Sequence, residues 1–490
     1  MRSLCALCAL CALSAFSALC VSASADEFRD VKKAFTKAFA GPAPAKEREF
    51  AVRKLAGFDS KDAAKLLVGG IPVSRKQYNL LLVERANVQS GKIEFPDGGP
   101  QPRLNELKTE IDREMRVLEA IDDALSRMRE KKTITWLCRD ALRDKSSHVR
   151  VSVAKALGRI GDATAIPALG KALSDKSDRV RGAAILSLGR LKASDLVPDL
   201  IEHLEDGTWT IRAAACEALA AIGDLRAIVP LIERLPQEQG RMAEDVAAAL
   251  ERLTGQRFGT AEDAWRRWLE ANRDLIGKGG PLPKPPPPAE KKADDEDGYY
   301  GIPVATRKVI FILDISESMS YSAEKDQEKP KPGEDSRLDV AKRELKRALL
   351  RYSPKGRFTV VAFHNELTVW KSTMQDATKP KRDAAIAWAL ALKATGTTNI
   401  YAALEKAFAI AGMGVTDRHY NVAADSIYLL SDGAPTNVDL TDDDPDRILR
   451  AVREWNRLGR VKIHTIGMRG HNAWFMSKLA EQNGGTYVVR

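Results

Sequence analysis

The stretch KVIFILDISES, from Lys308 to Ser318, decides the fold of the C-terminal part of this chain. It opens with an apolar run of the kind that forms a strand buried on both faces of a parallel sheet. The polar part that follows, from Asp314 to Ser318, places one carboxylate and two serine hydroxyls at alternate positions. Alone, this D-x-S-x-S group is a weak motif, since many polar turns contain these residues. Its position directly after a buried strand strengthens it, because ligands of α/β sheets bind where the strands end.

Strands and helices alternate from Lys308 to the C-terminus. The segments predicted as strands are KVIFIL, RFTVVAF, LTVWK, SIYLL, VKIHTIGM and TYVVR. The segments predicted as helices are RLDVAKRELKRALLRY, RDAAIAWALAL, YAALEKAFAIAG, DPDRILRAVREWNRLG and AWFMSKLAEQNG. This alternation predicts an α/β doubly wound, Rossmann-like domain over residues 306–490, with a mostly parallel sheet covered by helices on both faces.

Two further polar loops belong with the first. Gly396-Thr397-Thr398-Asn399-Ile400 precedes a predicted helix, and Ser431-Asp432-Gly433 follows a predicted strand. The three loops together offer five oxygen ligands, from Asp314, Ser316, Ser318, Thr398 and Asp432. Two carboxylates and three hydroxyls suit a hard divalent cation, Mg²⁺ or alternatively Mn²⁺ or Ca²⁺. Because few protein charges would contact such an ion directly, it would stay electrophilic and could accept an acidic group from a partner.

This set of loops resembles the von Willebrand factor A family and its metal-ion-dependent adhesion site. The resemblance extends to the ending LAEQNGGTYVV. It implies that the five residues named above are metal ligands, and that a carboxylate from a protein partner completes the shell. One departure from the family pattern is the charged insertion YSAEKDQEKPKPGEDS, residues 321–336, which is either a disordered flap or part of the partner surface. His364 follows a predicted strand, and we expect it to be a loop residue rather than a ligand.

Residues 133–255 carry an internal repeat with a period of 31 residues. Apolar columns recur at this period, for example Leu142, Leu173, Leu204 and Leu235, or Leu157, Leu188, Leu219 and Leu250. Each unit predicts two short antiparallel helices that bury their apolar stripes only by stacking on neighbouring units, which gives an all-α solenoid. The unit HVRVSVAKALGRIGDATAIPALGKAL resembles the HEAT-like repeats of the phycobilisome-lyase type. That resemblance implies a protein-binding scaffold.

Other residues also follow the frame of the repeat. Cys138 and Cys216 fall in apolar columns, so we expect buried, inert thiols. An arginine recurs in three successive units, and we expect inter-repeat contacts there, with a stacked ligand-binding ladder as the alternative; the residues are Arg150, Arg181 and Arg212. Trp265 and Trp268 follow the last unit, and we expect them to cap the end of the solenoid.

The rest of the chain falls into three segments. Residues 1–25 contain a basic residue, an apolar run and the sequence Ala-Ser-Ala, which predicts a secretory signal peptide, with a retained membrane anchor as the alternative. Residues 26–132 form a helical N-terminal region, which leads into the solenoid and its Trp-containing cap at 133–276. Residues 277–305 form a Pro-rich and acidic linker, which we expect to be stiff.

Composition and motifs narrow the function. The net charge of +10 is spread over 490 residues with no arginine-rich run or basic-aromatic interleaving, so nucleic acid is not expected as a partner. The sequence shows no Ser/His/Asp set, two-metal carboxylate cluster or nucleotide loop, which disfavours an enzyme using Asp314 or Glu317.

We expect an exported adaptor protein, periplasmic or extracellular, with no membrane span in its mature chain. Its metal site would bind an acidic side chain of a protein partner, and its solenoid would be a second interaction surface. The alternative is a structural cell-envelope protein whose metal site only stabilises the fold.

Overall fold

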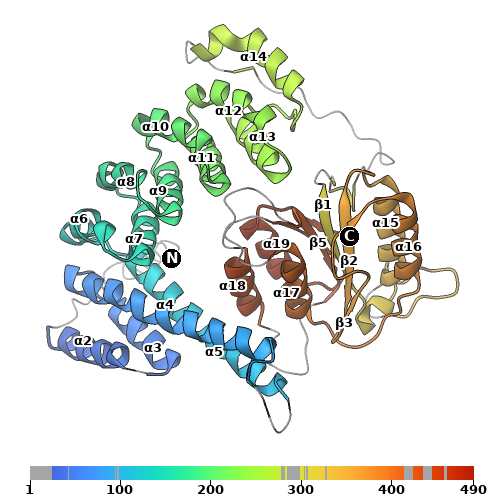
Figure 1. Ribbon diagram of the computed structural model, residues 1–490, viewed down its shortest axis with the longest axis horizontal. Helices are drawn as coiled ribbons and strands as arrows, with labels where there is room; N and C mark the ends of the chain where they lie inside the picture. Colours follow the sequence, from blue (N-terminus) through green and yellow to red (C-terminus); the bar gives the residue numbers. More distant parts are fainter. Residues whose placement is uncertain are drawn as a thin grey trace, which may run out of the picture. The chain divides into compact units, whose positions relative to one another are not determined.

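The computed structural model describes residues 25–41, 43–93, 95, 99–277, 282–283, 298–302, 304, 307–325, 328–412, 423–433, 444–456 and 461–490 (Figure 1). The expected signal peptide, apart from Ala25, and most of the expected linker lie outside these residues. Contacts within the chain divide it into two units, Met1–Ser187 and Leu188–Arg490, and each is described by itself. No helix of the described residues is long and apolar enough to cross a membrane.

Long helices open the described part of the first unit. These are α2 (Ala25–Ala40), α3 (Ala45–Leu55), α4 (Lys61–Gln89) and α5 (Gln101–Ser126). Helix α5 packs against α3 and α4. Its buried residues recur at steps of three, four or seven positions, as on one face of an amphipathic helix; they include Leu107, Ile111, Leu118, Ile121 and Leu125. A buried ion pair between Arg48 and Glu114 joins α3 to α5.

The repeat begins in the first unit with short helices in alternation. They are α6 (Lys131–Arg139), α7 (Ser147–Ile160), α8 (Ile166–Ala172) and α9 (Asp178–Arg190), the last of which crosses the boundary between the units. In Figure 1, α6 and α8 lie along one side of this stack and α7 and α9 along the other. Helices α7 and α9 approach closely at Gly158, where a Cβ atom would lie 2.4 Å from the Ser187 hydroxyl oxygen. Ser187 donates a hydrogen bond to the carbonyl of Ala154 at 2.9 Å, so this close contact carries no unsatisfied hydroxyl.

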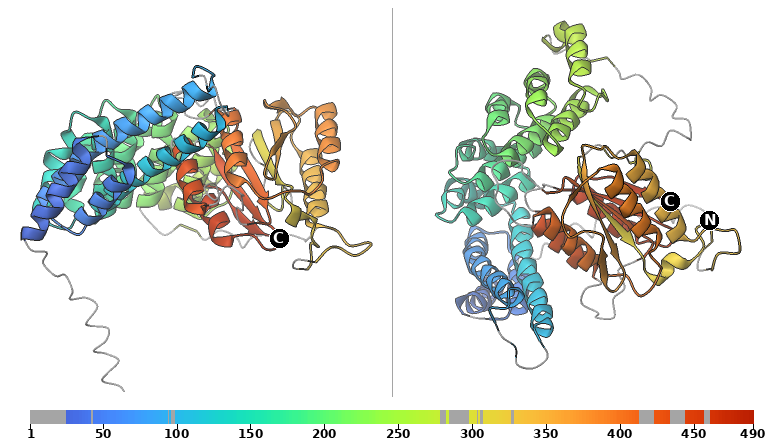
Figure 2. Two further views of the ribbon diagram at one scale, coloured as in Figure 1. Left: turned by 90° about the horizontal axis from the view of Figure 1, so that it is seen from below. Right: turned by 45° about the vertical axis from the view of Figure 1, so that its right-hand side comes forward.

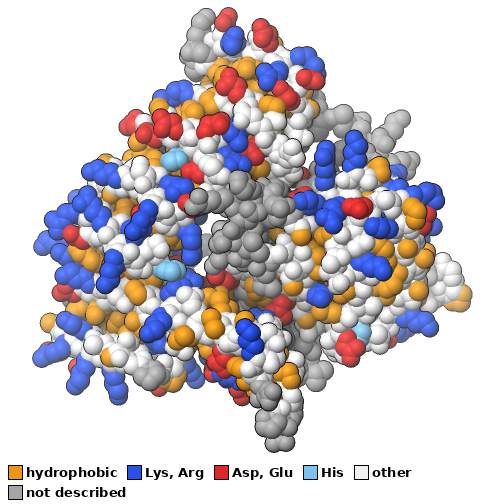
Figure 3. Space-filling model, viewed as in Figure 1, with side chains coloured by type: hydrophobic (Ala, Val, Ile, Leu, Met, Phe, Trp, Pro, Cys, Tyr) orange, Lys and Arg blue, Asp and Glu red, His pale blue; other side chains and the backbone are white. Residues whose placement is uncertain are grey.

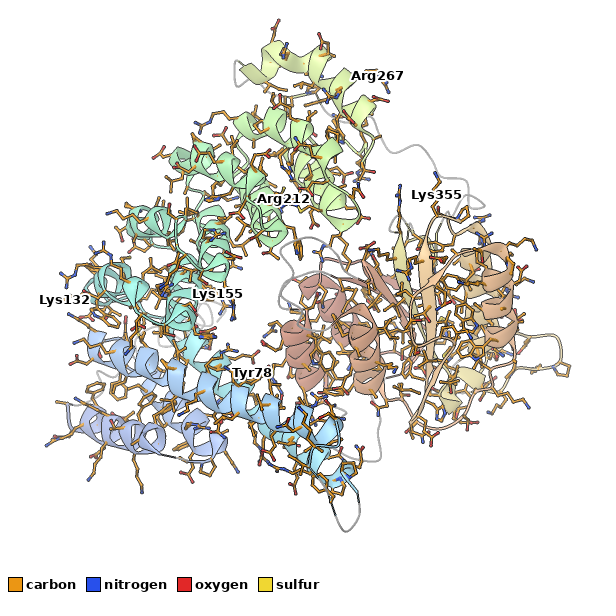
Figure 4. The ribbon with its side chains drawn as sticks, viewed as in Figure 1. Tyr78, Lys132, Lys155, Arg212, Arg267 and Lys355 are labelled. Atoms are coloured by element: carbon orange, nitrogen blue, oxygen red, sulfur yellow. The ribbon has the colours of Figure 1, made fainter. Side chains whose placement is uncertain are left out.

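The recurring arginines make structural contacts between and within repeats. Arg150 donates to the carbonyl of Asp144 at 2.8 Å and to both carboxylate oxygens of Asp175, in the next repeat, at 2.7 and 2.8 Å. Arg212, labelled in Figure 4, donates to the carbonyl of Asp206 at 2.9 Å and to the Glu238 carboxylate. The prediction of inter-repeat contacts is therefore confirmed for Arg150 and Arg212.

The second unit continues the helical pattern before the sheet begins. Its helices are α10 (Val197–Glu202), α11 (Trp209–Ile222), α12 (Ile228–Arg234), α13 (Arg241–Thr254) and α14 (Glu262–Gly277). Helix α14 packs against α12 and buries Trp265 completely, with the Trp268 ring 6.2 Å away.

The two cysteines of the repeat differ in burial. Cys216 is buried in α11, and burial raises the pKa of its thiol well above the ordinary range. Cys138 in α6 is only partly buried, so the prediction of a buried core position is wrong for this residue. The reason is its place in the first repeat, where it lines an open groove between α6 and α8. Burial still raises the pKa of the Cys138 thiol to about 11, which disfavours the reactive thiolate.

A mostly parallel sheet forms the C-terminal domain, as predicted. Its strands are β1 (Lys308–Asp314), β2 (Arg357–Phe363), β3 (Leu367–Val369), β4 (Gln375–Asp376), β5 (Ser426–Ser431), β6 (Lys462–Gly467) and β7 (Tyr487–Val489). The order across the sheet is β3-β2-β1-β5-β6-β7, with β4 paired to β2. The short strands β3 and β4 run antiparallel to β2, and the other pairings are parallel.

Helices cover both faces of the sheet (Figure 1 and Figure 2). The helices are α15 (Arg337–Arg351), α16 (Lys379–Leu390), α17 (Ile400–Ala411), α18 (Pro445–Trp455) and α19 (Ala473–Gln482). Alternate residues of β1 enter two separate cores. Val309, Phe311 and Leu313 pack in the core with α15 and α16, and Ile310 and Ile312 pack in the core with α17, α18 and α19. Strand β1 is thus central to both layers, and the loop after it lies at the middle of the sheet edge.

Candidate metal site at the carboxyl edge of the sheet

The two acidic residues of the predicted site end neighbouring parallel strands. Asp314 is the last residue of β1, and Asp432 directly follows β5. Strands β1 and β5 pair in register, with Leu313 opposite Leu430, so their following loops leave the sheet side by side. Asp314 is fully buried and Asp432 is 2% exposed. Parallel pairing therefore brings together two carboxylates that are 118 positions apart in the sequence numbering.

Serine hydroxyls link the first loop to the third. The Ser316 amide donates to Asp314 Oδ1 at 2.8 Å, which fixes the turn after β1. The hydroxyls of Ser316 and Ser318 lie 3.1 Å apart, and Ser318 donates to Asp432 Oδ1 at 2.7 Å. Four of the five predicted ligands thus form one connected group of oxygens.

The second loop meets the third at Thr398. Thr398 is buried, and a Cβ atom placed on Gly433 would lie only 3.1 Å from its hydroxyl oxygen. Glycine at position 433 therefore allows the second loop to approach the residue next to Asp432. The loop is held by the Glu317 amide, which donates to the Gly396 carbonyl at 2.9 Å. It leads into α17, where the Asn399 side chain caps the helix by accepting from the Ala402 amide at 2.9 Å.

His364 supports this loop from the side. Its carbonyl accepts a hydrogen bond from the Asn399 amide at 3.1 Å, and its ring Nδ1 lies 2.5 Å from Asn365 Oδ1. These contacts are those of a residue that supports a loop, as expected for His364. His464 of β6 stacks on Tyr428 at 4.6 Å, and burial lowers the pKa of its imidazole to about 4.

Burial and mutual repulsion act against two ionised carboxylates at this edge. Burial and the nearby Asp432 carboxylate raise the pKa of Asp314 to about 7. Burial also raises the pKa of Asp432, although hydrogen bonds from Arg337 and Ser318 oppose that shift. A divalent cation would reverse both effects by compensating the two charges. The donor set of two carboxylates and three hydroxyls fits Mg²⁺ better than Zn²⁺, which prefers sulfur and nitrogen ligands. No cluster of three or more His, Cys, Asp or Glu suited to a metal occurs among the described residues.

Two residues at the site were not assigned a role from the sequence. Ser431, the last residue of β5, donates from its hydroxyl to Asp314 Oδ2 at 2.5 Å. Arg337, the first residue of α15, donates to Asp432 Oδ2 at 2.7 Å, with 4% of the Arg337 side chain and none of the Asp432 side chain exposed. The sequence pattern could have indicated a buried Arg337. Arg337, Ala341 and Leu345 follow one another at steps of four residues and so lie on the same, buried side of α15. An arginine on an apolar stripe needs a buried anion.

The insertion packs beside the metal loop. Its described residues, 321–325 and 328–336, are held by backbone hydrogen bonds, including Ser322 to the Glu328 carbonyl at 2.7 Å and Ala323 to the Asp335 carbonyl at 3.1 Å. Lys329 pairs with Glu317 of the metal loop at 3.1 Å. The Tyr321 ring lies under the Arg337 guanidinium at 5.8 Å. Between the two alternatives for the insertion, these contacts support a surface next to the site rather than a disordered flap.

Comparisons with known families agree with the helical repeats and with the α/β domain. The family model for HEAT repeats matches residues 101–181 and 166–251, and the model for the von Willebrand factor type A domain matches residues 309–435. The chain contains HEAT repeats followed by a von Willebrand factor type A domain. The matched part of this A domain begins in β1 and ends two residues after Gly433, so it includes all five predicted ligands.

The curated relatives match a part of this chain and a small part of their own length. Inter-alpha-trypsin inhibitor heavy chain 4 of Mus musculus is 26% identical over 204 residues, which are 39% of this chain and 19% of that protein. The human von Willebrand factor A domain-containing protein 3A is 29% identical over 133 residues, 26% of this chain and 10% of that protein. The chain thus spans a fifth or less of these relatives. Among solved structures, a von Willebrand factor type A protein from Catenulispora acidiphila is 22% identical, with 38% of each chain covered and a TM-score of 0.30.

Proposed function

We propose that the A domain binds a divalent cation, Mg²⁺ first, through Asp314, Ser316, Ser318, Thr398 and Asp432, and recognises a protein partner through it. One observation carries the proposal. Two buried carboxylates lie at neighbouring strand ends, where Asp314 accepts from the Ser431 hydroxyl and Asp432 accepts from the Ser318 hydroxyl. Arg337 is the single cation seen bonded to either carboxylate among the described residues. When bound, the metal supplies an electrophilic centre that can accept a carboxylate oxygen from a partner.

The charges at the site favour an acidic partner. With both carboxylates ionised, as metal binding requires, two carboxylates and one guanidinium leave one net negative charge in a buried site. A divalent ion changes this balance to one net positive charge, which attracts an acidic side chain and disfavours a basic one. Asp314 and Asp432 would hold the ion, the hydroxyls of Ser316, Ser318 and Thr398 would offer neutral oxygens, and Ser431 would keep Asp314 in place.

The proposal extends to the whole chain. The A domain and the HEAT repeats each support a protein-interaction role, and their combination supports an adaptor that is not an enzyme. The N-terminal Ala-Ser-Ala sequence after an apolar run supports export to the periplasm or beyond. The HEAT repeats would then offer a second interaction surface in addition to the metal-dependent one.

Metal-dependent capture tests the proposal. The full chain is immobilised and exposed to cell-envelope proteins of its source with Mg²⁺, and bound proteins are eluted with EDTA. We expect EDTA to release partners from the wild-type protein and from an Arg343→Met control, but not from Asp314→Ala. Capture of the same partners by the wild type and by Asp314→Ala, with none released by EDTA, would contradict metal-dependent recognition. A Mg²⁺-stabilised protein with no EDTA-released partner would favour the alternative, a structural envelope protein whose metal site only stabilises the fold.

A further inference from the structure

Charge changes sign along the HEAT repeats. Residues 131–192 contain 14 Lys and Arg against 5 Asp and Glu, whereas residues 193–254 contain 5 against 12. In Figure 3, Lys and Arg gather on the surface over α6 and α8. Lys132, labelled in Figure 4, points away from α6 on this side. The basic excess is therefore concentrated in the first repeats rather than spread along the solenoid.

A groove of about 800 Å³ lies between α6 and α8 inside this basic region. Leu142, Pro167 and Ala168 supply apolar surface to its lining. Its cationic lining residues are Arg139, Arg143, Lys145, Arg150, Lys171 and Lys176. The groove combines apolar surface with several cationic side chains, and all of its lining belongs to the first unit.

The acidic residues of the groove are already occupied. The carboxylate of Asp175 accepts from Arg150 at 2.7 and 2.8 Å and from the Ser177 amide at 2.8 Å. Asp144 Oδ1 accepts from the Ser146 amide at 2.7 Å. By contrast, Arg143, Lys145 and Lys171 are exposed and form no ion pair with the described part of the chain. The groove therefore presents cations that its own carboxylates leave uncompensated.

The repeat itself shows that packing does not require these cations. One and two periods of 31 residues after Lys171, the sequence has Glu202 and Glu233. One and two periods after Arg143, it has Ser174 and Glu205. The same repeat positions thus accept either sign of charge, and the basic groove is a property of the first repeats alone.

We propose that the groove between α6 and α8 binds an acidic, extended segment of a protein partner. The apolar lining favours a polypeptide with side chains to bury, and the cations favour carboxylates. A single-stranded nucleic acid is disfavoured, because the groove lining has no aromatic side chain on which a base could stack. A membrane surface is disfavoured, since none of the large apolar side chains exposed in the described residues lies in α6, α7 or α8.

This inference deepens the proposed second interaction surface, but it does not depend on metal binding by the A domain. The test is fluorescence anisotropy of a labelled octaglutamate peptide with the full chain in EDTA, at about 20 and about 150 mM salt. The test variant is Arg143→Glu/Lys171→Glu, which places at each position a residue that later repeats carry there. The control is Lys33→Glu/Lys37→Glu, an equal change of charge on exposed residues of α2 in the same unit.

We expect the wild type and the α2 control to bind the peptide within about twofold of each other, and the groove variant to bind at least about tenfold more weakly, a difference of about 1.4 kcal/mol. Asp314→Ala should bind like the wild type, so a failed metal proposal would leave this result unchanged. Equal binding by the groove variant and the control would overturn the proposal, as would no binding by the wild type. The proposal would also be overturned if an oligothymidylate, or vesicles with phosphatidylserine, bound the wild type more tightly than the peptide does and lost this binding in the groove variant.

Discussion

Arg337→Met removes the cation that balances the buried site while keeping a long side chain. Arg337 and Asp432 are almost completely shielded from solvent, with side-chain exposures of 4% and 0%. Removing one partner of such a pair leaves an uncompensated buried charge and costs about 3–5 kcal/mol. Arg337 also packs over the Tyr321 ring, so the insertion should loosen at the same time.

The effect of magnesium should increase in this variant. In the wild type, Arg337 already compensates part of the negative charge of the two carboxylates, and a bound metal compensates the rest. In Arg337→Met, the metal would be the main counter-charge for Asp314 and Asp432, so Mg²⁺ should restore a large share of the lost stability. Hydrogen exchange of peptides covering β1 and β5, with Mg²⁺ or with EDTA, measures the local opening free energy on both sides of the site.

Arg343→Met on the same helix is the matched control. Arg343 pairs with Asp335 at 2.6 Å, but the two side chains are 58% and 46% exposed. An exposed pair of this kind contributes about 0–1 kcal/mol. The reasoning would be refuted if Arg337→Met and Arg343→Met lost equal protection in EDTA, or if Mg²⁺ stabilised Arg337→Met less than the wild type.

Two further predictions concern the same site. Burial and the Asp432 charge raise the pKa of Asp314 from 3.8 to about 7, so the contribution of this group to the stability of the metal-free A domain is fully present below pH 3.8 and is lost as pH rises through 7. Because Mg²⁺ needs the ionised carboxylate, its affinity should rise about tenfold from pH 6 to pH 8 in calorimetric titrations, and an affinity independent of pH would count against the shifted group. Gly433→Ala should weaken Mg²⁺ binding by about 1–3 kcal/mol, because its Cβ would lie 3.1 Å from the Thr398 hydroxyl. Gly207→Ala, where nothing lies within 4 Å of an added Cβ, is the control and should bind Mg²⁺ like the wild type.

The sequence predicted most of the fold because its signals were periodic. The leucines that recur every 31 residues predicted the stacked helices, and the apolar run before Asp314 predicted the central strand. The edge strand β4 (Gln375–Asp376) was missed, since two polar residues carry no alternation pattern. Cys138 was assigned to the core because its column is apolar in later repeats, but the first repeat leaves that position partly open.

The candidate metal ligands were predicted from the three loops, but the residues that hold these ligands in place were not. Asp314, Ser316, Ser318 and Asp432 come together through parallel pairing of β1 and β5, which a strand-loop pattern anticipates. The contact of Arg337 with Asp432 spans 95 positions and depends on how α15 packs on the sheet. Sequence spacing carries no direct information on that packing, although an arginine on the apolar side of a helix indicates a buried anion.

Calorimetric titration of the full chain with Mg²⁺, compared with Asp314→Asn, tests the central claim most directly. Asparagine keeps the size of the side chain and removes the charge that the metal needs. We predict one Mg²⁺ site in the wild type and no measurable binding in Asp314→Asn, with unchanged far-ultraviolet circular dichroism. Equal Mg²⁺ binding by the two proteins, or no binding by the wild type at millimolar Mg²⁺, would contradict the account.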